Sequence, residues 1–484
     1  MLSSSKHRPS SRRREKSAAL RGAQGERVWA ALALSLAVPA AAQQPQAPAQ
    51  SAPYQRAVAA GYKALTLCSA VFNAGRTQAQ AEALELRGIY PEYDAIVPTL
   101  KAEVMRTDGR VIVPWSDTLP PREAVWHERT GCTIRPIGAG GGILVRADQA
   151  AYPEEPTGRP DTRPWPDGDA RIAPRPSPAL AAAVSRAFDR ATYGQGSETV
   201  GVVVVRDGKV AAERYRDGFG PYTSNRTWSV AKSLAGAVIG VAQAQGAIDV
   251  TQPAPVPEWA TPGDPRAAIT TDQLLRMASG LHSDTAGNRT DAIYFGGIAV
   301  TEQAPFQPLE AAPGTRFRYA NNDILLAVRA LRAKLGEERH RDFPARELFA
   351  KLGMRRTVAE TDWRGNYVLS SQVWSTARDL ARFGLFLLQD GMWNGERLLP
   401  QGWTAESLKP SGPQPASGPG YGRTLWLFGP AQGLPAGSYA AQGNRGQYVM
   451  VVPSERLVVV RRGEDPGPAR FDIAKFTADF IAAR

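Results

Sequence analysis

The sequence predicts an α+β fold in which strands from both ends of one domain form a single antiparallel sheet. Two pairs of apolar runs lead to this prediction, and the first pair flanks Asp207-Gly208, a dipeptide typical of two-residue hairpin turns. The chain between the two pairs has mostly helical spacing. We therefore expect terminal helices on one face of the sheet and a helical subdomain folded against the other face. The four runs are residues 199–206, 209–215, 447–453 and 456–462.

The chain is longer than a single hydrophobic core usually serves. It has 484 residues, and one core stops growing at ~250–300 residues. We divide it into a signal peptide, a disordered linker, a small amino-terminal accessory module, a second linker rich in proline and glycine, and the main domain with the sheet. Their ranges are 1–42, 43–53, 54–150, 151–178 and 179–484.

The first part has the three regions of a secretory signal. Residues 1–27 are basic and serine-rich, and the 15 residues from Val28 to Ala42 carry no charge and end in three alanines. Such a segment is short for a membrane span. We expect a periplasmic or secreted protein with no stable membrane span after cleavage. The long basic lead leaves two readings: an extended signal, or a translation start placed too far upstream.

Charge argues against a nucleic-acid partner. The formal net charge is +12, but residues 1–50 hold eight basic against two acidic residues, which is half of the excess. The remaining 50 basic and 44 acidic residues are nearly balanced.

The amino-terminal module is expected to contain two helices, at residues 54–76 and 78–86, and short strands at 110–114 and 132–135. It holds the only two cysteines, Cys68 and Cys132. In an exported chain such a pair predicts a disulfide, and two separate buried thiols are the alternative. Two cysteines without clustered histidines do not form a metal site.

Ser229 and Lys232 open an apolar helical run that ends at Gly246. Three positions apart, the two side chains share one helix face. A neutral lysine can remove the serine proton, and burial can lower the lysine pKa by ~3–5 units from ~10.4. The helix start favours an oxyanion. The structural alternative for this S-x-x-K motif is a capping serine beside a lysine that extends along the core.

Two later segments offer partners for this pair. Tyr319 and Asn321 precede a helical run, where a phenol could relay the proton and an amide could hold the lysine and a substrate carbonyl. A capped loop-to-helix junction is the alternative reading. Residues 441–447 carry glycines at a strand edge, where backbone N–H groups could complete an oxyanion hole, or where the chain simply turns.

Together these segments resemble the penicillin-recognising serine hydrolases, which include serine β-lactamases, D-alanyl-D-alanine peptidases, related esterases and 6-aminohexanoate-dimer hydrolases. The resemblance covers about residues 180–484 and looks closest to the last branch. It implies a β-lactamase/transpeptidase-like fold, with Ser229 as acylated nucleophile, Lys232 as base, Tyr319 as proton shuttle and Asn321 as a substrate-binding residue. The segments that carry it are Trp228–Ser233, Leu274–Leu281, Pro313–Asn322, Ser375–Gly384 and Gly446–Tyr448.

The chain departs from the family at its third motif. Where the family has Lys or His followed by Thr-Gly, this chain has Ala441-Gln442-Gly443. The resemblance makes Gly443 the motif glycine and Asn444 the residue whose N–H completes the oxyanion hole. Arg445 is the candidate to replace the missing charge. This gap weakens the case for β-lactams or peptides with a carboxylate.

Several other side chains have both a structural and a functional interpretation. His282 is read as a solvated loop residue, with a place in the cleft as the alternative. Trp228 and Trp426 are candidates to shape the substrate pocket, although most tryptophans are core. Arg378, Asp379 and Arg382 are predicted to form a surface ion-pair face on a helix.

We therefore predict an exported serine hydrolase that cleaves a small-molecule amide or ester, or a peptide, through an acyl-serine intermediate without a metal or organic cofactor. The alternative is a catalytically silent binding or sensing module, which the missing basic residue favours.

Overall fold

The computed structural model describes residues 51–140, 161–172, 174–283 and 290–483. The predicted signal peptide, most of the linker at 43–53, residues 141–150 of the module and residues 151–160 of the second linker lie outside the described residues. The first helix begins at Ala52, so the end of the predicted linker is helical instead. No helix within the described ranges is long and apolar enough to span a bilayer.

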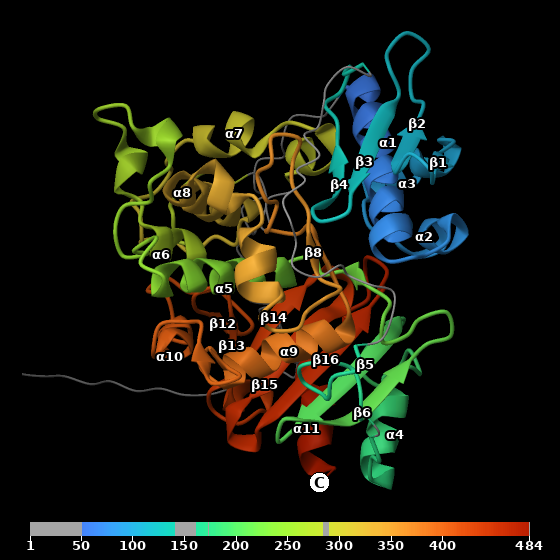
Figure 1. Ribbon diagram of the computed structural model, residues 1–484, viewed down its shortest axis with the longest axis vertical. Coiled ribbons are helices and arrows are strands. Elements are labelled where there is room, and N and C mark those ends of the chain that lie inside the picture. The colour runs from blue at the N-terminus through green and yellow to red at the C-terminus, as the bar shows by residue number, and fades with distance from the viewer. Residues whose placement is uncertain (1–50, 141–160, 173, 284–289, 484) are drawn as a thin grey trace, which may run out of the picture. The chain divides into compact units, whose positions relative to one another are not determined.

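The amino-terminal module packs helices on a four-stranded antiparallel sheet of order β1-β2-β3-β4 (Figure 1). Both predicted helices and both predicted strands are present. The strands β1 and β3 were not expected. The elements are α1 Ala52–Cys68, continued by a helical turn at Ser69–Asn73, α2 Gln78–Leu84, α3 Pro91–Asp94, β1 Glu103–Met105, β2 Arg110–Val113, β3 Arg122–His127 and β4 Gly131–Ile134.

The main domain is built on a seven-stranded antiparallel sheet, which confirms the predicted fold class. Its order is β12-β13-β14-β15-β16-β5-β6, so the first and last hairpins of the domain pair through β16 and β5. The strands are β5 Thr199–Arg206, β6 Lys209–Tyr215, β12 Gly420–Tyr421, β13 Trp426–Phe428, β14 Ser438–Gly443, β15 Gln447–Val452 and β16 Leu457–Gly463.

Alternate valines of the central strands pack in two separate hydrophobic cores. Val202 and Val204 of β5 pack in the cluster under the terminal helices α4 and α11, whereas Val203 and Val205 belong to the larger cluster on the other face. This alternation follows from the two-residue repeat of a strand. The helices of the main domain are α4 Pro178–Arg186, α5 Val230–Ala244, α6 Thr271–Leu275, α7 Val300–Gln303, α8 Asn321–His340, α9 Ala377–Leu388, α10 Trp403–Ser407 and α11 Ile473–Ala482.

Shorter strands complete the domain. A three-stranded sheet has the order β7-β9-β8, and its strand β7 ends at Arg226, shortly before α5 begins. A two-stranded ladder follows α9. These strands are β7 Asn225–Arg226, β8 Val358–Ala359, β9 Val373–Ser375, β10 Met392–Trp393 and β11 Glu396–Arg397.

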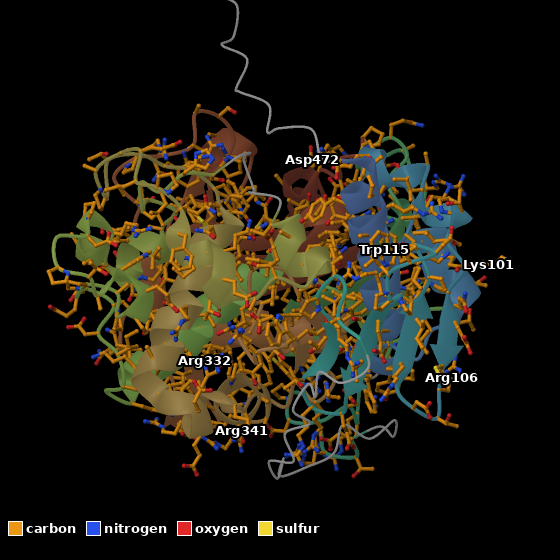
Figure 2. All side chains as sticks on the ribbon, turned by 90° about the horizontal axis from the view of Figure 1, so that it is seen from above. Lys101, Arg106, Trp115, Arg332, Arg341 and Asp472 are labelled. Atoms are coloured by element: carbon orange, nitrogen blue, oxygen red, sulfur yellow. A yellow bond between two sulfur atoms is a disulfide. The ribbon has the colours of Figure 1, made fainter. Side chains whose placement is uncertain are left out.

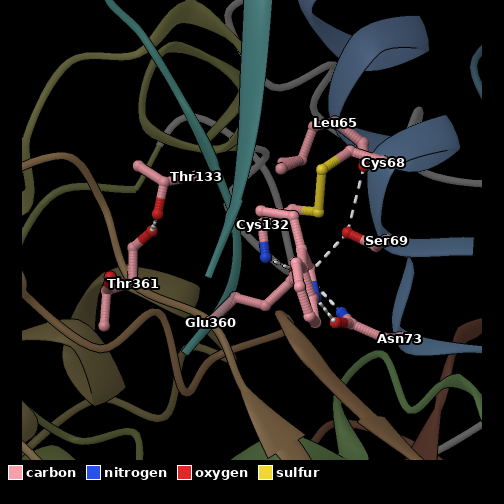
Figure 3. The surroundings of a disulfide bond; sticks show 9 residues. Leu65, Cys68, Ser69, Asn73, Cys132, Thr133, Glu360 and Thr361 are labelled. Atoms are coloured by element: carbon pink, nitrogen blue, oxygen red, sulfur yellow. Dashed lines mark hydrogen bonds between the residues drawn. A yellow bond between two sulfur atoms is a disulfide. The ribbon is translucent and has the colours of Figure 1, made fainter. Parts of the chain in front are cut away.

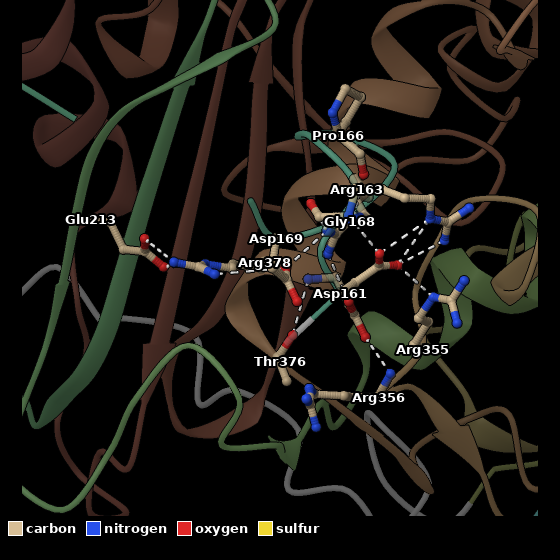
Figure 4. Close-up of polar contacts among 12 residues, drawn as sticks. Asp161, Arg163, Pro166, Gly168, Asp169, Glu213, Arg355, Arg356, Thr376 and Arg378 are labelled. Atoms are coloured by element: carbon tan, nitrogen blue, oxygen red, sulfur yellow. Dashed lines mark hydrogen bonds and ion pairs between the residues drawn. The ribbon is translucent and has the colours of Figure 1, made fainter. Parts of the chain in front are cut away.

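The predicted surface ion-pair face on α9 is wrong, because Arg378, Asp379 and Arg382 are buried. Arg378 pairs with Glu213 of β6 at 2.7 Å, and Arg382 pairs with Asp379 at 3.0 Å. Arg382 also donates to the backbone oxygens of Pro166 and Gly168, both at 2.7 Å. The second linker thus covers this helix and buries its charges (Figure 4).

Charged groups elsewhere are both buried, as at Arg461 and Arg462, and exposed. Lys101 and Arg106 of the module and Asp472 before α11 are exposed, whereas the apolar ring of Trp115 is buried (Figure 2).

The predicted disulfide between Cys68 and Cys132 is confirmed, and it joins the end of α1 to β4. Beside it, Glu360 of the main domain reaches into the module (Figure 3). Its Oε1 accepts hydrogen bonds from Ser69 Oγ at 2.6 Å, Asn73 Nδ2 at 2.8 Å and the backbone N–H of Cys132 at 3.1 Å. The module and the main domain share one compact unit and a continuous hydrophobic core.

Burial raises the pKa of Glu360 from 4.5 to about 7, against the opposing effect of its hydrogen bonds. The folded protein therefore holds this proton where the unfolded chain has lost it. The free energy of unfolding should fall as pH rises from about 4.5 to about 7, by up to ~3 kcal/mol at ~1.36 kcal/mol per unit.

Glu360→Gln keeps an acceptor oxygen but has no proton to lose. Chemical denaturation at about pH 5 and about pH 8 should therefore show the wild type losing stability relative to this variant as pH rises. Parallel pH dependence in the two proteins would contradict the expectation.

Candidate active site

Ser229 lies at the entrance of α5, where the backbone turns sharply into the helix. Trp228 before it has φ +50°, a left-handed conformation that bulky side chains rarely adopt. The guanidinium of Arg226 lies 3.9 Å from the centre of the Trp228 ring, and the Thr227 N–H donates to the Val373 oxygen at 2.8 Å. These contacts hold the turn and present Ser229, which is only half-buried, to the cavity in front of it.

Lys232, one turn further along α5, is 1% exposed and has no carboxylate partner among the described residues. Its Nζ lies 2.9 Å from Ser229 Oγ, 2.6 Å from Asn321 Oδ1 and 2.8 Å from the backbone oxygen of Ser370. Burial, together with the charge of Arg226, holds the pKa of Lys232 well below 10.5. The environment therefore favours the neutral amine.

The three contacts of Lys232 can be made by a neutral amine, the form that burial favours. Two of the neighbouring atoms, Asn321 Oδ1 and the Ser370 oxygen, are carbonyl oxygens that only accept hydrogen bonds. They take both N–H groups of an uncharged amine, so its lone pair is left to face Ser229. The site is thus arranged to accept the serine proton.

Tyr319 lies on the other side of this pair. Its ring centre is 5.0 Å from Lys232 Nζ, and the ring packs against Tyr421 and Trp426. Burial raises the pKa of Tyr319, and a side-chain hydrogen bond with Ser229 opposes that rise. A protonated phenol within hydrogen-bonding reach of Ser229 can relay a proton.

The end of β14 approaches the serine closely. A Cβ added to Gly443 would lie 2.3 Å from the Thr227 oxygen and 3.0 Å from the Ser229 nitrogen, so only glycine fits between the strand and the turn. Asn444 follows and lines the same cavity. The backbone of Ser229 and the end of β14 thus meet where an oxyanion hole would form.

Ser279, from one of the segments that carry the resemblance, supports the helix that holds Asn321. Its Oγ donates to Asp323 Oδ1 at 2.9 Å in the first turn of α8. Burial raises the pKa of Asp323 to about 7. This contact fixes the start of α8 and so places Asn321 beside Lys232.

A cavity of about 670 Å³ opens in front of Ser229. Aromatic rings form much of its surface, and Asp291 is the one charged side chain among the described residues that line it. The lining residues are Ile89, Tyr90, Pro91, Trp228, Ser229, Asp291, Tyr294, Tyr319, Asn321, Ser371, Trp426, Gln442, Gly443 and Asn444.

Arg445 does not replace the missing basic residue, which corrects the sequence-based expectation. It is buried and absent from the cavity lining. Its guanidinium pairs with the Glu464 carboxylate and donates to the backbone oxygens of Glu464 at 2.8 Å and Asp465 at 3.1 Å. A buried arginine takes the nearest buried carboxylate, and here Glu464 lies behind the strand end, away from the cavity.

His282 is also outside the cavity, in agreement with its reading as a loop residue. Its Nδ1 lies 2.5 Å from Glu310 Oε1, and both side chains are partly exposed. Trp228 and Trp426 do line the cavity, as proposed for them from the sequence.

No sequence pattern indicates several of the groups at the site. The Ser370 acceptor is a backbone oxygen, which no side-chain pattern can indicate. Tyr294 lines the cavity, and its hydroxyl oxygen lies 2.5 Å from Ser370 Oγ. Tyr90 belongs to the amino-terminal module, far from Ser229 in sequence, so only the fold brings it here.

Comparison with known proteins agrees with this geometry. Residues 184–484 match the Beta-lactamase family. A 6-aminohexanoate-dimer hydrolase from Paenarthrobacter ureafaciens is 30% identical over 296 residues, which are 55% of this chain and 72% of that protein. A candidate 6-aminohexanoate-dimer hydrolase from Bacillus anthracis has a similar fold, with a TM-score of 0.51 at 23% identity over 59% of this chain and 78% of the other.

Lys232→Ala should lower kcat by ~10²–10⁴-fold, because the serine loses its base. In the wild type, kcat/KM should rise with pH as the amine loses its proton, and it should level off well below pH 10.5, since burial lowers the pKa of Lys232. Steady-state kinetics across the pH range and a thermal unfolding curve of the variant measure both. Turnover unchanged by the substitution would remove Lys232 from the mechanism.

Proposed function

The chain belongs to the Beta-lactamase family of serine hydrolases, and on that premise we propose that it cleaves an amide or ester through an acyl intermediate on Ser229. In this proposal Lys232 is the base, Tyr319 relays the proton, and Asn321, Gly443 and Asn444 contact the substrate. The environment of Lys232 carries the proposal, because a buried lysine between two carbonyl oxygens directs its lone pair at Ser229.

The reaction has two balanced halves. In the first, Lys232 takes the proton of Ser229 while Oγ bonds to the substrate carbonyl carbon, and the developing oxyanion lies between the backbone of Ser229 and the end of β14. Tyr319 passes a proton to the leaving amine or alcohol and receives the proton held by Lys232 in its place, and the bond between the carbonyl carbon and the leaving group breaks. In the second half, water attacks the acyl-serine, and its proton returns to Oγ as the acid is released.

The alternative is a silent binding or sensing module. The absence of a basic residue at the third motif favours it, since Ala441 stands where the family has Lys or His. The intact contacts among Ser229, Lys232 and Asn321 oppose it, because a module that only binds ligands has no need of a buried, uncharged lysine beside a serine.

A fluorophosphonate, which reacts with activated serines, separates the two readings. The wild type should be labelled at Ser229, and Ser229→Ala should show no label and no turnover of p-nitrophenyl esters. Mass spectrometry locates the adduct. A wild type with no adduct under the same conditions would support the silent module.

The cavity favours substrates without a carboxylate. Gln442 is neutral, Arg445 is engaged with Glu464, and the charge that lines the described cavity is the carboxylate of Asp291. An anionic group there would meet the carboxylate of Asp291, and no cationic side chain is among the described residues that line the cavity. We propose neutral amides or esters as the substrate class, rather than β-lactams or peptides that end in a free carboxylate.

Gln442→Lys should add a cation to the cavity, one residue after Ala441, where the family has Lys or His. In the variant, kcat/KM for nitrocefin, which carries a carboxylate, should rise about tenfold relative to kcat/KM for a neutral p-nitrophenyl ester. A tenfold change corresponds to ~1.4 kcal/mol, the size expected of one charge-assisted contact. Gln442→Met is the control of similar length without charge. Equal ratios in the lysine and methionine variants would contradict the proposal.

We also propose that the protein is exported to the periplasm or beyond. The disulfide between Cys68 and Cys132 supports this, since such bonds persist in oxidising compartments, and so does the signal-like start of the sequence. Fractionation of expressing cells tests it: an amino terminus beginning near Gln43 in the periplasm or medium is expected, and an uncleaved cytoplasmic protein would contradict it.

A further inference from the structure

The amino-terminal module reaches the cavity of the main domain. Ile89, Tyr90 and Pro91, at the start of α3, line it together with Trp228 and Ser229. The family match covers residues 184–484 only, so this wall comes from outside the matched region. We propose that the module is the specificity element of the enzyme and that Tyr90 selects neutral substrates with a bulky apolar group. This inference rests on the proposed function, which supplies the reaction.

Tyr90 is held by rings from both parts of the chain. Its ring centre lies 5.0 Å from that of Tyr62 in the module, 5.5 Å from that of Phe295 and 6.3 Å from that of Trp228 in the main domain. Aromatic pairs at such distances restrict one another's orientation. Since Trp228 directly precedes Ser229, the Tyr90 ring is positioned against the turn that carries the nucleophile.

Polar contacts fix the segment around Tyr90 to the main domain. The Tyr93 hydroxyl donates to Asp291 Oδ2 at 2.8 Å, and the Gly467 N–H donates to the Gly88 oxygen at 3.0 Å. Within the segment, the Gly88 N–H donates to Asp94 Oδ1 at 3.2 Å. The segment that forms this wall is therefore attached on both sides of Tyr90. A surface needs such rigidity if it is to discriminate between substrates of different shape.

The rest of the module is attached at two further places. Arg122 donates to the backbone oxygens of Phe295 at 2.9 Å and Gly296 at 3.1 Å. In α1, a Cβ added to Gly61 would lie 2.1 Å from the Phe295 oxygen, so the helix and this turn are in direct contact. Together with Glu360, these contacts leave the module little freedom to swing away from Ser229.

The chemistry of the wall suits an apolar group. Ile89, Tyr90 and Pro91 present no charge, and the neighbouring surfaces are Trp228, Tyr294 and Trp426. Such a surface gains free energy from apolar area and offers no counter-ion. The segment thus complements a neutral ester or amide with an aromatic or branched aliphatic substituent.

Tyr90→Ala removes the ring, and Tyr90→Phe keeps it. Two ester series test the effect: one enlarges the acyl group from acetyl to phenylbutanoyl, and the other enlarges the alcohol from methyl to phenylethyl. In the wild type the bulky member of at least one series should have the higher kcat/KM. Tyr90→Ala should lower that ratio about tenfold, and Tyr90→Phe should hold it within about twofold.

Leu119→Ala is the matched control, since Leu119 is an exposed residue of the same module, 47% accessible, outside the cavity lining. It should leave the ratio unchanged. Thermal unfolding of all variants separates loss of the ring from loss of the fold. If Tyr90→Ala lowered all esters by the same factor in both series, the selectivity role of Tyr90 would be overturned.

Binding gives a second readout that does not need catalysis. In a Ser229→Ala background, the bulky ester should quench tryptophan fluorescence, and adding Tyr90→Ala should weaken its Kd about tenfold. Equal Kd values would overturn the inference. If the wild type turned over no ester but the bulky ester still bound in a Tyr90-dependent way, the proposed hydrolase activity would be overturned. The role of Tyr90 in binding would then stand.

Discussion

The site depends on one constraint, which is that Lys232 is buried without a carboxylate among its described neighbours. A charged amine would lose its hydration there without the compensation of a carboxylate, so burial favours the neutral form. The two carbonyl oxygens that contact it come from distant parts of the chain, the start of α8 and the segment before β9. The α5 helix, buried on every side, supplies the low-polarity surroundings that make this possible.

The same principle explains the charges that the fold does bury. Arg445, Arg378 and Arg382 all have carboxylate partners, and Arg445 and Arg382 also donate to backbone oxygens. They act as structural clamps: Arg445 behind the end of β14, and the α9 pair beneath the second linker. Lys232 differs from these three because it has no carboxylate partner among its described neighbours, and it lies where the chemistry is expected.

The amino-terminal module is part of this arrangement rather than an appendage. The disulfide closes the module on itself, while Glu360 and Arg122 fasten it to the main domain. Its aromatic residues continue the core that lies beneath Trp228. A cavity formed partly by such a module can change its shape without any change to Ser229, Lys232 or Tyr319, which lets chemistry and selectivity vary independently.

The sequence by itself determined the features that depend on local pattern. The two hairpins, the buried helix behind Ser229, the Ser229 and Lys232 pair and the disulfide all follow from strand and helix periodicity, turn residues and cysteine count, and the family resemblance supplied Tyr319 and Asn321. Only the tertiary structure decided what depends on contacts between distant segments. These include the Ser370 oxygen at Lys232, the turning of Arg445 toward Glu464, the burial of Arg378, Asp379 and Arg382, and the arrival of Tyr90 at the cavity. A sequence pattern reports which face of an element is apolar, but it does not report what covers that face, because the covering segment is fixed by packing across the whole chain.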